Sequence, residues 1–553
     1  MNKLENKKIK ITFDDGQEIV VKCKTTVEEA FNKTKTEEEM QGILAAKLDN
    51  EIKTFDTKIV NNARLSGVTF YDREGYRIYI RTVRFILLMA IKRIYPEIDI
   101  EYINTLDNRS YFICKNKEFT PLMAAEILKE MRTIVKNASR IEKKVLGYEE
   151  ARALFKMHKD ENRLETTARK MDSFITLCFC EDMYNNMYGA LAPNTSLVPN
   201  FDIKVFRKGF LLIYPESGDI NKINTKIKDN KIYDVIEKHI KYADNIKVRS
   251  ITELNEKIID NKTEDLVKVC EAIHSNQMAE LVKEIEKKEG IRMILIAGPS
   301  SSGKTTFAGK LSINLKLLGY NPVAISMDNY YKNIADRYIK EEGKFDSESV
   351  YALDLELFNS HIKSLLEGKK VKTPKFNFYT GEREKEGMFV KLNPDDIVII
   401  EGIHALNPLV SKVVPDENKF KIYIEPMTTL SIDDYSRFST TDTRILRRLV
   451  RDYNTRGLKV EKTFSMWADI MKGEREYIYP FANDADYIFN TSITYEISAL
   501  KLVAEPLLLQ VTKENEYFLE ARRLYGLLKN FLSMQTKYIP ADSIIREFIG
   551  RPS

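Results

Sequence analysis

One loop constrains the fold of this 553-residue chain more than any other feature. Residues 298–305 read Gly-Pro-Ser-Ser-Ser-Gly-Lys-Thr, which matches the pattern G-x-x-x-x-G-K-[ST] in full. The apolar run 292–297 precedes the loop as an expected buried strand, and a helix is expected to follow it as far as Leu318. In that setting the backbone N–H groups of the loop and of the helix N-terminus can surround phosphate groups. The sequence therefore predicts a nucleoside triphosphate site formed by Gly298, Pro299, Ser300, Ser301, Ser302, Gly303, Lys304, Thr305 and Thr306.

Two side chains of this loop have expected roles of their own. Lys304 would reach the β- and γ-phosphates of the nucleotide. The hydroxyl oxygen of Thr305 would bind Mg²⁺. The loop predicts a nucleoside triphosphate as one reactant, but it leaves the phosphate acceptor open.

The rest of the C-terminal half alternates between apolar, strand-like runs and helical stretches. Residues 323–326, 397–400 and 420–424 are rich in Val and Ile. Such runs, separated by helices, are typical of a parallel sheet covered on both faces. We therefore expect an α/β fold of the P-loop NTPase type for residues 290–553, with ligands at the carboxyl ends of the strands.

Two carboxylates are expected at that edge of the sheet. Asp328 follows the second run, where it can accept the proton of an attacking hydroxyl or hold the metal ion. The structural alternative is that Asp328 caps the next helix. Glu401 ends the third run, where it would support the metal ion or its waters, unless it only solvates a strand end. The predicted metal-binding residues are therefore Thr305, Asp328 and Glu401.

Arginines recur at helical spacing in the segment 442–452. A spacing of three and four residues places them on one helix face, and a guanidinium array suits the charge of a transferring phosphoryl group. The alternative is a solvated charged surface. We expect this helix and the turn at 453–457 to form a lid that excludes water from the nucleotide. The arginines concerned are Arg444, Arg447, Arg448 and Arg451.

Taken together, these segments resemble the uridine kinase/phosphoribulokinase family. Phe345-Asp346, residues 352–355, residues 374–383 and the late Tyr479-Pro480 pair add to the resemblance. It implies a kinase that uses ATP and Mg²⁺ to phosphorylate the 5′-hydroxyl of a uridine- or cytidine-like ribonucleoside. The implied catalytic residues are Asp328 as the base, with Lys304, Arg444, Arg447 and Arg451 on the phosphoryl group. The implied acceptor-binding residues are Asp346, Phe376, Arg383 and Arg444, with Asp346 and Arg444 on the sugar.

The acceptor segment departs from the family pattern. Phe376 stands where uridine kinases have Tyr, Asn377 where they have Asp, and Gly381 where they have His. A site with fewer hydrogen-bonding side chains rejects analogues less well. The resemblance therefore implies kinase chemistry more firmly than uridine specificity, and a phosphorylated pentose stays open as the acceptor.

The N-terminal half resembles the extension of a bacterial subgroup of this family. Residues 1–65 look like a TGS domain of the β-grasp type, and residues 66–215 like the α+β editing domain of threonyl-tRNA synthetase. That editing site uses H-x-x-x-H, but residues 81–85 read Arg-Thr-Val-Arg-Phe and no histidine precedes His158. We therefore expect a non-catalytic role in RNA binding, dimerisation or regulation. Residues 216–289 are expected to be a loosely packed helical connector.

Composition limits the classes of protein that the chain can represent. The net charge of +5 is nearly neutral for this length, which argues against a protein that coats nucleic acid. A nucleotide-gated RNA-binding regulator nevertheless remains an alternative. No apolar run approaches the roughly 20 residues of a membrane span, and the N-terminus does not look like a signal peptide. Five cysteines fit a reduced, cytoplasmic compartment. The close pair Cys178 and Cys180 suits two core thiols better than a metal site.

Overall fold

The computed structural model describes two compact units, which are treated separately below. Residues 7–550 are described, except 107, 159, 161–162, 165–166, 168–172, 228–229, 334–347, 378–379 and 434. Unit 1 comprises Met1–Lys228, Ser431–Arg437 and Lys513–Leu519; unit 2 comprises Asp229–Leu430, Phe438–Thr512 and Glu520–Ser553. No helix among the described residues is long and apolar enough to span a bilayer.

A five-stranded parallel sheet organises unit 2. Its strands are β13 (Met293–Ala297), β14 (Pro322–Ser326), β19 (Ile397–Glu401), β20 (Lys419–Glu425) and β23 (Tyr487–Asn490), in the order β14-β19-β13-β20-β23. The first four confirm the predicted runs. The sequence analysis missed β23, because its four residues follow the polar segment 483–486 and form too short a run to stand out.

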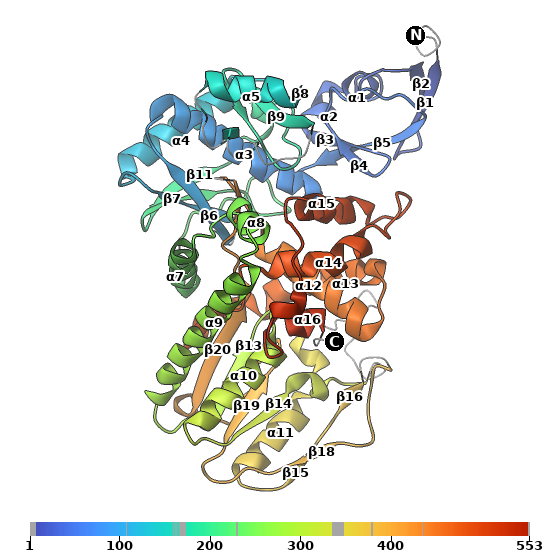
Figure 1. Ribbon diagram of the computed structural model, residues 1–553. Helices are drawn as coiled ribbons and strands as arrows, with labels where there is room; N and C mark the ends of the chain where they lie inside the picture. The colour runs from blue at the N-terminus through green and yellow to red at the C-terminus, as the bar shows by residue number, and fades with distance from the viewer. Residues whose placement is uncertain are drawn as a thin grey trace. The chain divides into compact units, whose positions relative to one another are not determined.

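Helices cover this sheet, and one of them comes from the predicted connector. α9 (Thr263–Glu286) packs against α10 (Lys304–Leu317), which follows the phosphate loop (Figure 1). Leu281 and Ile285 of α9 belong to the same buried cluster as Phe307 and Ile294. The prediction of a loosely packed connector is therefore wrong for α9, because its apolar face completes the core beneath the sheet. α7 (Lys231–Ile246) and α8 (Ile251–Ile259) precede it.

The remaining elements of unit 2 lie after β14. They include α11 (Leu355–Leu366) and two small hairpins, β15 (Val371–Thr373) with β18 (Met388–Val390) and β16 (Phe376–Asn377) with β17 (Glu382–Arg383). Helices α12 (Thr440–Arg456), α13 (Val460–Tyr477) and α14 (Glu496–Leu508) follow β20 in the chain. The last two helices are α15 (Phe518–Leu528), whose first two residues belong to unit 1, and the short α16 (Arg546–Ile549).

Unit 1 begins with a small mixed sheet. Its strands are β1 (Lys8–Phe13), β2 (Glu18–Lys22), β3 (Ile43–Leu48), β4 (Glu51–Lys53) and β5 (Ala63–Thr69), in the order β2-β1-β5-β3-β4. β1 and β2 form an antiparallel hairpin, as the Asp-Asp-Gly turn at 14–16 indicates. Thr26 caps α1 (Val27–Phe31), and Glu29 completes a capping box. α2 (Glu37–Gln41) follows α1 in the chain.

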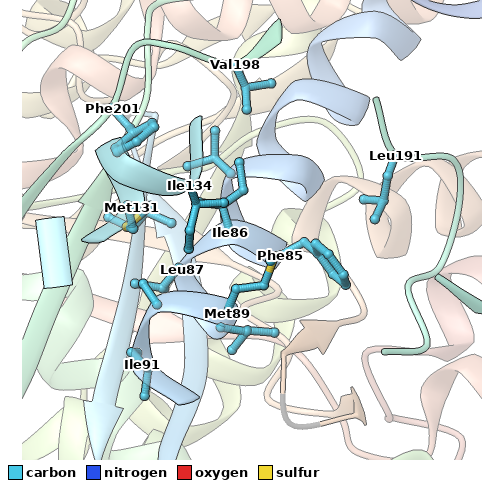
Figure 2. Close-up of a cluster of buried hydrophobic side chains, with 14 of the residues drawn as sticks. Phe85, Ile86, Leu87, Met89, Ile91, Met131, Ile134, Leu191, Val198 and Phe201 are labelled. Carbon is cyan, nitrogen blue, oxygen red and sulfur yellow. The ribbon is translucent and has the colours of Figure 1, made fainter. Parts of the chain in front are cut away.

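The second part of unit 1 is built around α3 (Arg73–Ile94). Residues 85–91 of α3 lie in a buried apolar cluster with Met131 and Ile134 of α4 (Pro121–Lys136), as Figure 2 shows. A four-stranded sheet contains β6 (Ile100–Leu106), β7 (Arg109–Cys114), β11 (Asp202–Phe206) and β12 (Gly209–Ile213); a three-stranded sheet contains β8 (Glu142–Gly147), β9 (Phe174–Cys180) and β10 (Met183–Asn185). α5 (Tyr148–Met157) follows β8. The buried face of α3 also includes Ile78 and Tyr79, nearer its N-terminus.

The cysteine pair lies in this core. Cys178 and Cys180 are both buried on β9. Burial raises the pKa of the Cys178 thiol to about 11 and that of Cys180 to about 12. At neutral pH both side chains are therefore protonated thiols that pack in the core. Among the described residues, no group of three or more His, Cys, Asp or Glu side chains could hold a metal ion.

Candidate active site in unit 2

The phosphate loop joins β13 to α10, as the sequence analysis predicted. Two of its positions require glycine. A Cβ atom on Gly298 would lie 2.2 Å from the carbonyl oxygen of Ile424, and Gly303 caps α10 with a φ of +90°. The loop therefore turns tightly enough to direct its N–H groups and the N-terminus of α10 to one place.

Lys304 lies at the centre of this loop. Its ammonium donates hydrogen bonds to the carbonyl oxygens of Gly298 at 3.0 Å and Pro299 at 3.1 Å. Burial lowers the pKa of Lys304, and the nearby carboxylates of Glu401 and Asp328 oppose that shift. The structure thus brings together three residues that were predicted from separate parts of the sequence.

The two carboxylates lie at the carboxyl edge of the sheet. Glu401 ends β19, and burial together with repulsion from Asp328 raises its pKa to about 7. Burial also raises the pKa of Asp328, against the attraction of Lys304, Arg456 and Arg451. Asp328 lies inside a 3-10 turn (Met327–Tyr330) whose N-cap is Ser326, so it is not the cap of a helix.

This group of oxygens is suited to a divalent cation. Two buried carboxylates that repel each other gain stability when a cation neutralises them. Mg²⁺ is commonly held by one or two carboxylates together with substrate phosphates and water. Thr305 stands in the first turn of α10, beside the loop. The residues present therefore fit the Mg²⁺ site that the family pattern implies.

The arginines of α12 face the loop. Arg444 is fully buried; its Nε donates to the carbonyl oxygen of Ser300 at 3.0 Å, and its guanidinium pairs with Glu474. Arg447 is also fully buried; it donates to Glu496 at 2.6 Å and to the carbonyl oxygen of Ser301 at 3.4 Å. The alternative of a solvated charged face is therefore wrong for this helix.

The other two arginines contact the phosphate loop and the segment that carries Glu547. Arg448 donates to the Ser300 hydroxyl at 2.7 Å and pairs with Asp452 at 3.2 Å. Arg451 lies 3.6 Å from Glu547. Burial and the neighbouring Arg456 lower the pKa of Arg451 to about 10. These two guanidinium groups remain charged at neutral pH and border the loop.

Sequence reasoning missed the acidic partners of these arginines. Glu474 is completely buried on α13, accepts a hydrogen bond from the Ser300 N–H at 2.8 Å, and also accepts from the Tyr479 hydroxyl at 3.4 Å. Glu547 accepts from Thr306. Buried arginines require acidic partners, so the sequence indicates that such partners exist. It does not show which of the many Glu residues they are.

Two of the predicted acceptor residues, Phe376 and Arg383, contact the turn that carries Asp328 or the residue after it. Phe376 is buried, and its backbone N–H donates to the Asn329 side chain at 3.2 Å. Arg383 donates to the carbonyl oxygens of Tyr331 and Tyr330, each at 2.9 Å, and to Asp354 at 3.1 Å. Arg383 is thus placed to hold the turn rather than to extend toward a ligand.

Two further acceptor-side predictions have different outcomes. Gly381 forms a turn with a φ of +74°, and its N–H donates to the carbonyl oxygen of Asn377 at 2.8 Å. Asp346, predicted to hold the sugar, lies outside the described residues.

His404 is buried near Tyr477, with the ring centroids 6.1 Å apart.

Glu425 provides a test of the electrostatics around the loop. It ends β20, accepts a hydrogen bond from the Tyr423 hydroxyl at 3.2 Å, and has a pKa that burial raises from 4.5 to about 7. A raised carboxyl pKa stabilises the folded state below pH 4.5, and that stabilisation is lost as the pH rises through 7. Between pH 5 and pH 8, the free energy of unfolding should therefore fall by roughly 2 kcal/mol more for the native chain than for Glu425→Gln.

Denaturant unfolding at the two pH values measures this difference. The Glu425→Gln variant keeps the size and a hydrogen-bonding side chain, so it isolates the titration. Parallel pH dependence in the native chain and the variant would show that Glu425 does not titrate in this range.

Comparison with known proteins identifies the same part of the chain. The family model described as Phosphoribulokinase / Uridine kinase family matches residues 293–498. A uridine kinase from Halobacterium salinarum is 31% identical over 194 residues, which cover 35% of this chain and 77% of the relative. A uridine kinase from Macrococcus caseolyticus is 30% identical over 215 residues, which cover 38% of this chain and 95% of the relative. A solved structure of a possible uridine kinase from Bacillus stearothermophilus aligns with 27% of this chain and 79% of its own at 25% identity and a TM-score of 0.24.

The sequence matches and the phosphate loop therefore agree on the class of enzyme. The Macrococcus relative is aligned over nearly its whole length at 30% identity. The range that the family model matches, residues 293–498, includes the loop, Asp328, Glu401 and the α12 arginines. The chain belongs to the phosphoribulokinase/uridine kinase family, and it is a P-loop kinase that acts on a hydroxyl group.

Proposed function

We propose that this protein transfers the γ-phosphate of ATP to the 5′-hydroxyl of a ribonucleoside, in a reaction that requires Mg²⁺. The observation that carries the proposal is the meeting of Asp328, Glu401 and Lys304 beside a complete phosphate loop. The names of the relatives, which are uridine kinases, favour a nucleoside as the acceptor.

Each residue then has a role in the transfer. Asp328 takes the proton of the acceptor hydroxyl while the oxygen of that hydroxyl attacks the γ-phosphorus. The bond between the γ-phosphorus and the β–γ bridging oxygen then breaks, which releases ADP. Lys304 and Arg451 stabilise the charge of the transferring phosphoryl group. Thr305, Asp328 and Glu401 would hold Mg²⁺, which would supply positive charge against the charge of the phosphate groups.

The fully buried arginines have a different part in this proposal. Arg444 and Arg447 are held by Glu474 and Glu496, and they donate to loop carbonyl oxygens. We assign these two arginines to positioning the phosphate loop. They would affect the phosphoryl group only indirectly, through the backbone of the loop. We do not assign Arg444 to the sugar, because its guanidinium is enclosed by these partners.

A phosphorylated pentose is the second candidate acceptor. The observation that favours it is the acceptor turn, where Gly381 supplies no side chain and the ring of Phe376 supplies no hydroxyl. Compared with the uridine kinase pattern, the turn therefore offers two fewer hydrogen-bonding side chains with which to select one base.

ADP release in the presence of candidate acceptors tests the proposal. The panel contains the common ribonucleosides and several phosphorylated pentoses. Stimulation by uridine or cytidine supports the nucleoside kinase. Stimulation by pentose phosphates alone favours the second candidate, and no stimulation by any nucleoside rejects the first.

The N-terminal unit has a separate proposed role. We propose that residues 1–65 form a TGS-like domain and residues 66–215 a non-catalytic relative of the threonyl-tRNA synthetase editing domain, which together contact RNA. Two arginines of the segment 81–85 support a non-catalytic role, because both are engaged in contacts within the domain. Arg84 donates to Ser110 and, at 2.9 Å, to Thr105, and Arg81 pairs with Glu74 at 2.6 Å. Affinity for tRNA that changes with ATP and falls steeply with salt would support RNA contact, whereas salt-independent or absent binding would reject it.

A further inference from the structure

The C-terminal segment 543–550 lies directly on the phosphate loop. A Cβ atom on Gly303 would be 2.7 Å from the Cγ2 atom of Ile544, so the Ile544 side chain packs closely against the backbone of this glycine. The carbonyl oxygen of Phe548 accepts a hydrogen bond from Asn454 of α12 at 3.0 Å. The ring of Phe548 lies 5.0 Å from the guanidinium carbon of Arg447.

Glu547 of this segment occupies the donors at the start of α10. Its Oε2 atom accepts from the Thr306 N–H at 3.3 Å and from the Thr306 hydroxyl at 3.1 Å. Its Oε1 atom lies 3.6 Å from Arg451. Thr306 is the third residue of α10, and N–H groups in this first turn have no partner within the helix. The carboxylate therefore uses the kind of donor that binds a phosphate oxygen.

The segment is fixed in this position by buried contacts. The Ser543 hydroxyl donates to Glu271 at 2.5 Å, and the Tyr495 hydroxyl donates to the same carboxylate at 2.6 Å. Arg546 donates to the carbonyl oxygens of Thr536 at 2.8 Å and Ile539 at 2.6 Å. Because Ser543 and Arg546 fix the chain before Glu547, and Phe548 fixes it after Glu547, the fold holds this carboxylate at the loop.

We infer that Glu547 sets the affinity of this kinase for its nucleotide by competing with a nucleotide phosphate for Thr306 and Arg451. The inference rests on the proposed binding of ATP at this loop. A carboxylate and a phosphate oxygen cannot accept from the same N–H group at once, and their like charges repel each other. Nucleotide binding therefore displaces Glu547 from Thr306 and releases Arg451, the guanidinium that we place on the transferring phosphoryl group.

Substitution of Glu547 tests this competition. In the full-length chain, Glu547→Gln removes the charge and Glu547→Ala removes the side chain beyond Cβ. We expect both variants to bind ATP about tenfold more tightly than the native chain, measured by titration calorimetry at fixed Mg²⁺, and to show a lower KM for ATP. Asp542→Asn is the matched control, because Asp542 lies in the preceding turn with a 70% exposed side chain paired with Lys310 at 3.3 Å. Its affinity should stay within twofold of the native value.

The Lys304→Ala variant separates failure of the inference from failure of the proposed function. If the native chain binds ATP, Lys304→Ala weakens that binding, and both Glu547 variants bind no more tightly than the native chain, the inference is wrong, while the nucleotide site on which the proposed function rests is supported. If the native chain and the Glu547 variants, folded by circular dichroism, all fail to bind ATP, the nucleotide site and the inference are both rejected.

Discussion

Asp328→Asn should lower kcat by about 10³- to 10⁴-fold and leave the Kd for ATP within about threefold of the native value. The side chain keeps its size and its place in the turn at 327–330, but the amide cannot take the proton of the acceptor hydroxyl. The loop N–H groups and Lys304, which hold the phosphates, are unchanged. Steady-state turnover with saturating acceptor and calorimetric titration with ATP measure the two quantities.

Asp395→Asn is the matched control for this substitution. Asp395 precedes β19, at the opposite end of the sheet from Glu401, and its side chain is exposed. The variant therefore makes the same change of charge without touching the site, and its turnover should match that of the native chain. A turnover of Asp328→Asn within tenfold of the native value would mean that another group accepts the proton.

Glu474→Ala should destabilise unit 2 by about 3–5 kcal/mol, because it leaves the fully buried guanidinium of Arg444 without its carboxylate. It also removes the acceptor of the Ser300 N–H, so the phosphate loop loses one of its fixed points. Weaker ATP binding should therefore accompany the loss of stability. Denaturant unfolding measures the first effect, and calorimetric titration below the transition measures the second.

Glu476→Ala serves as the control for this change. Glu476 lies two residues further along α13 with an exposed side chain, so its substitution makes the same truncation on the same helix. We expect its free energy of unfolding to stay within about 0.5 kcal/mol of the native value. If Glu474→Ala were as stable as Glu476→Ala, the buried pair with Arg444 would not be a structural element of the site.

Local patterns predicted the parts of the site that depend on neighbours in the sequence. The loop is recognised because its glycines, lysine and threonine occupy consecutive positions between a strand and a helix. Asp328 and Glu401 were predicted because each follows or ends a buried strand, and parallel strands bring their carboxyl ends to one edge. The common face of the α12 arginines followed from helical spacing alone.

Contacts between distant segments could not be predicted in the same way. Glu474 and Glu547 accept hydrogen bonds from loop residues that are 174 and 241 positions away in the chain. No periodicity in the sequence connects such distant positions. The arginines of α12 could therefore be placed on one face of a helix, but their carboxylate partners could not be identified. The connector prediction was wrong at α9 for the same reason, since its mixed composition does not show which residues meet α10.

Transfer of the terminal phosphate of ATP to uridine tests the central claim most directly. The full-length chain is incubated with Mg²⁺, uridine and ATP labelled with ³²P at the γ-position, and the products are separated by thin-layer chromatography. We expect label in uridine 5′-monophosphate, formed by the native chain and not detectably by Asp328→Asn. Label that stays in ATP and inorganic phosphate, with uridine and with each of the other ribonucleosides, would contradict it.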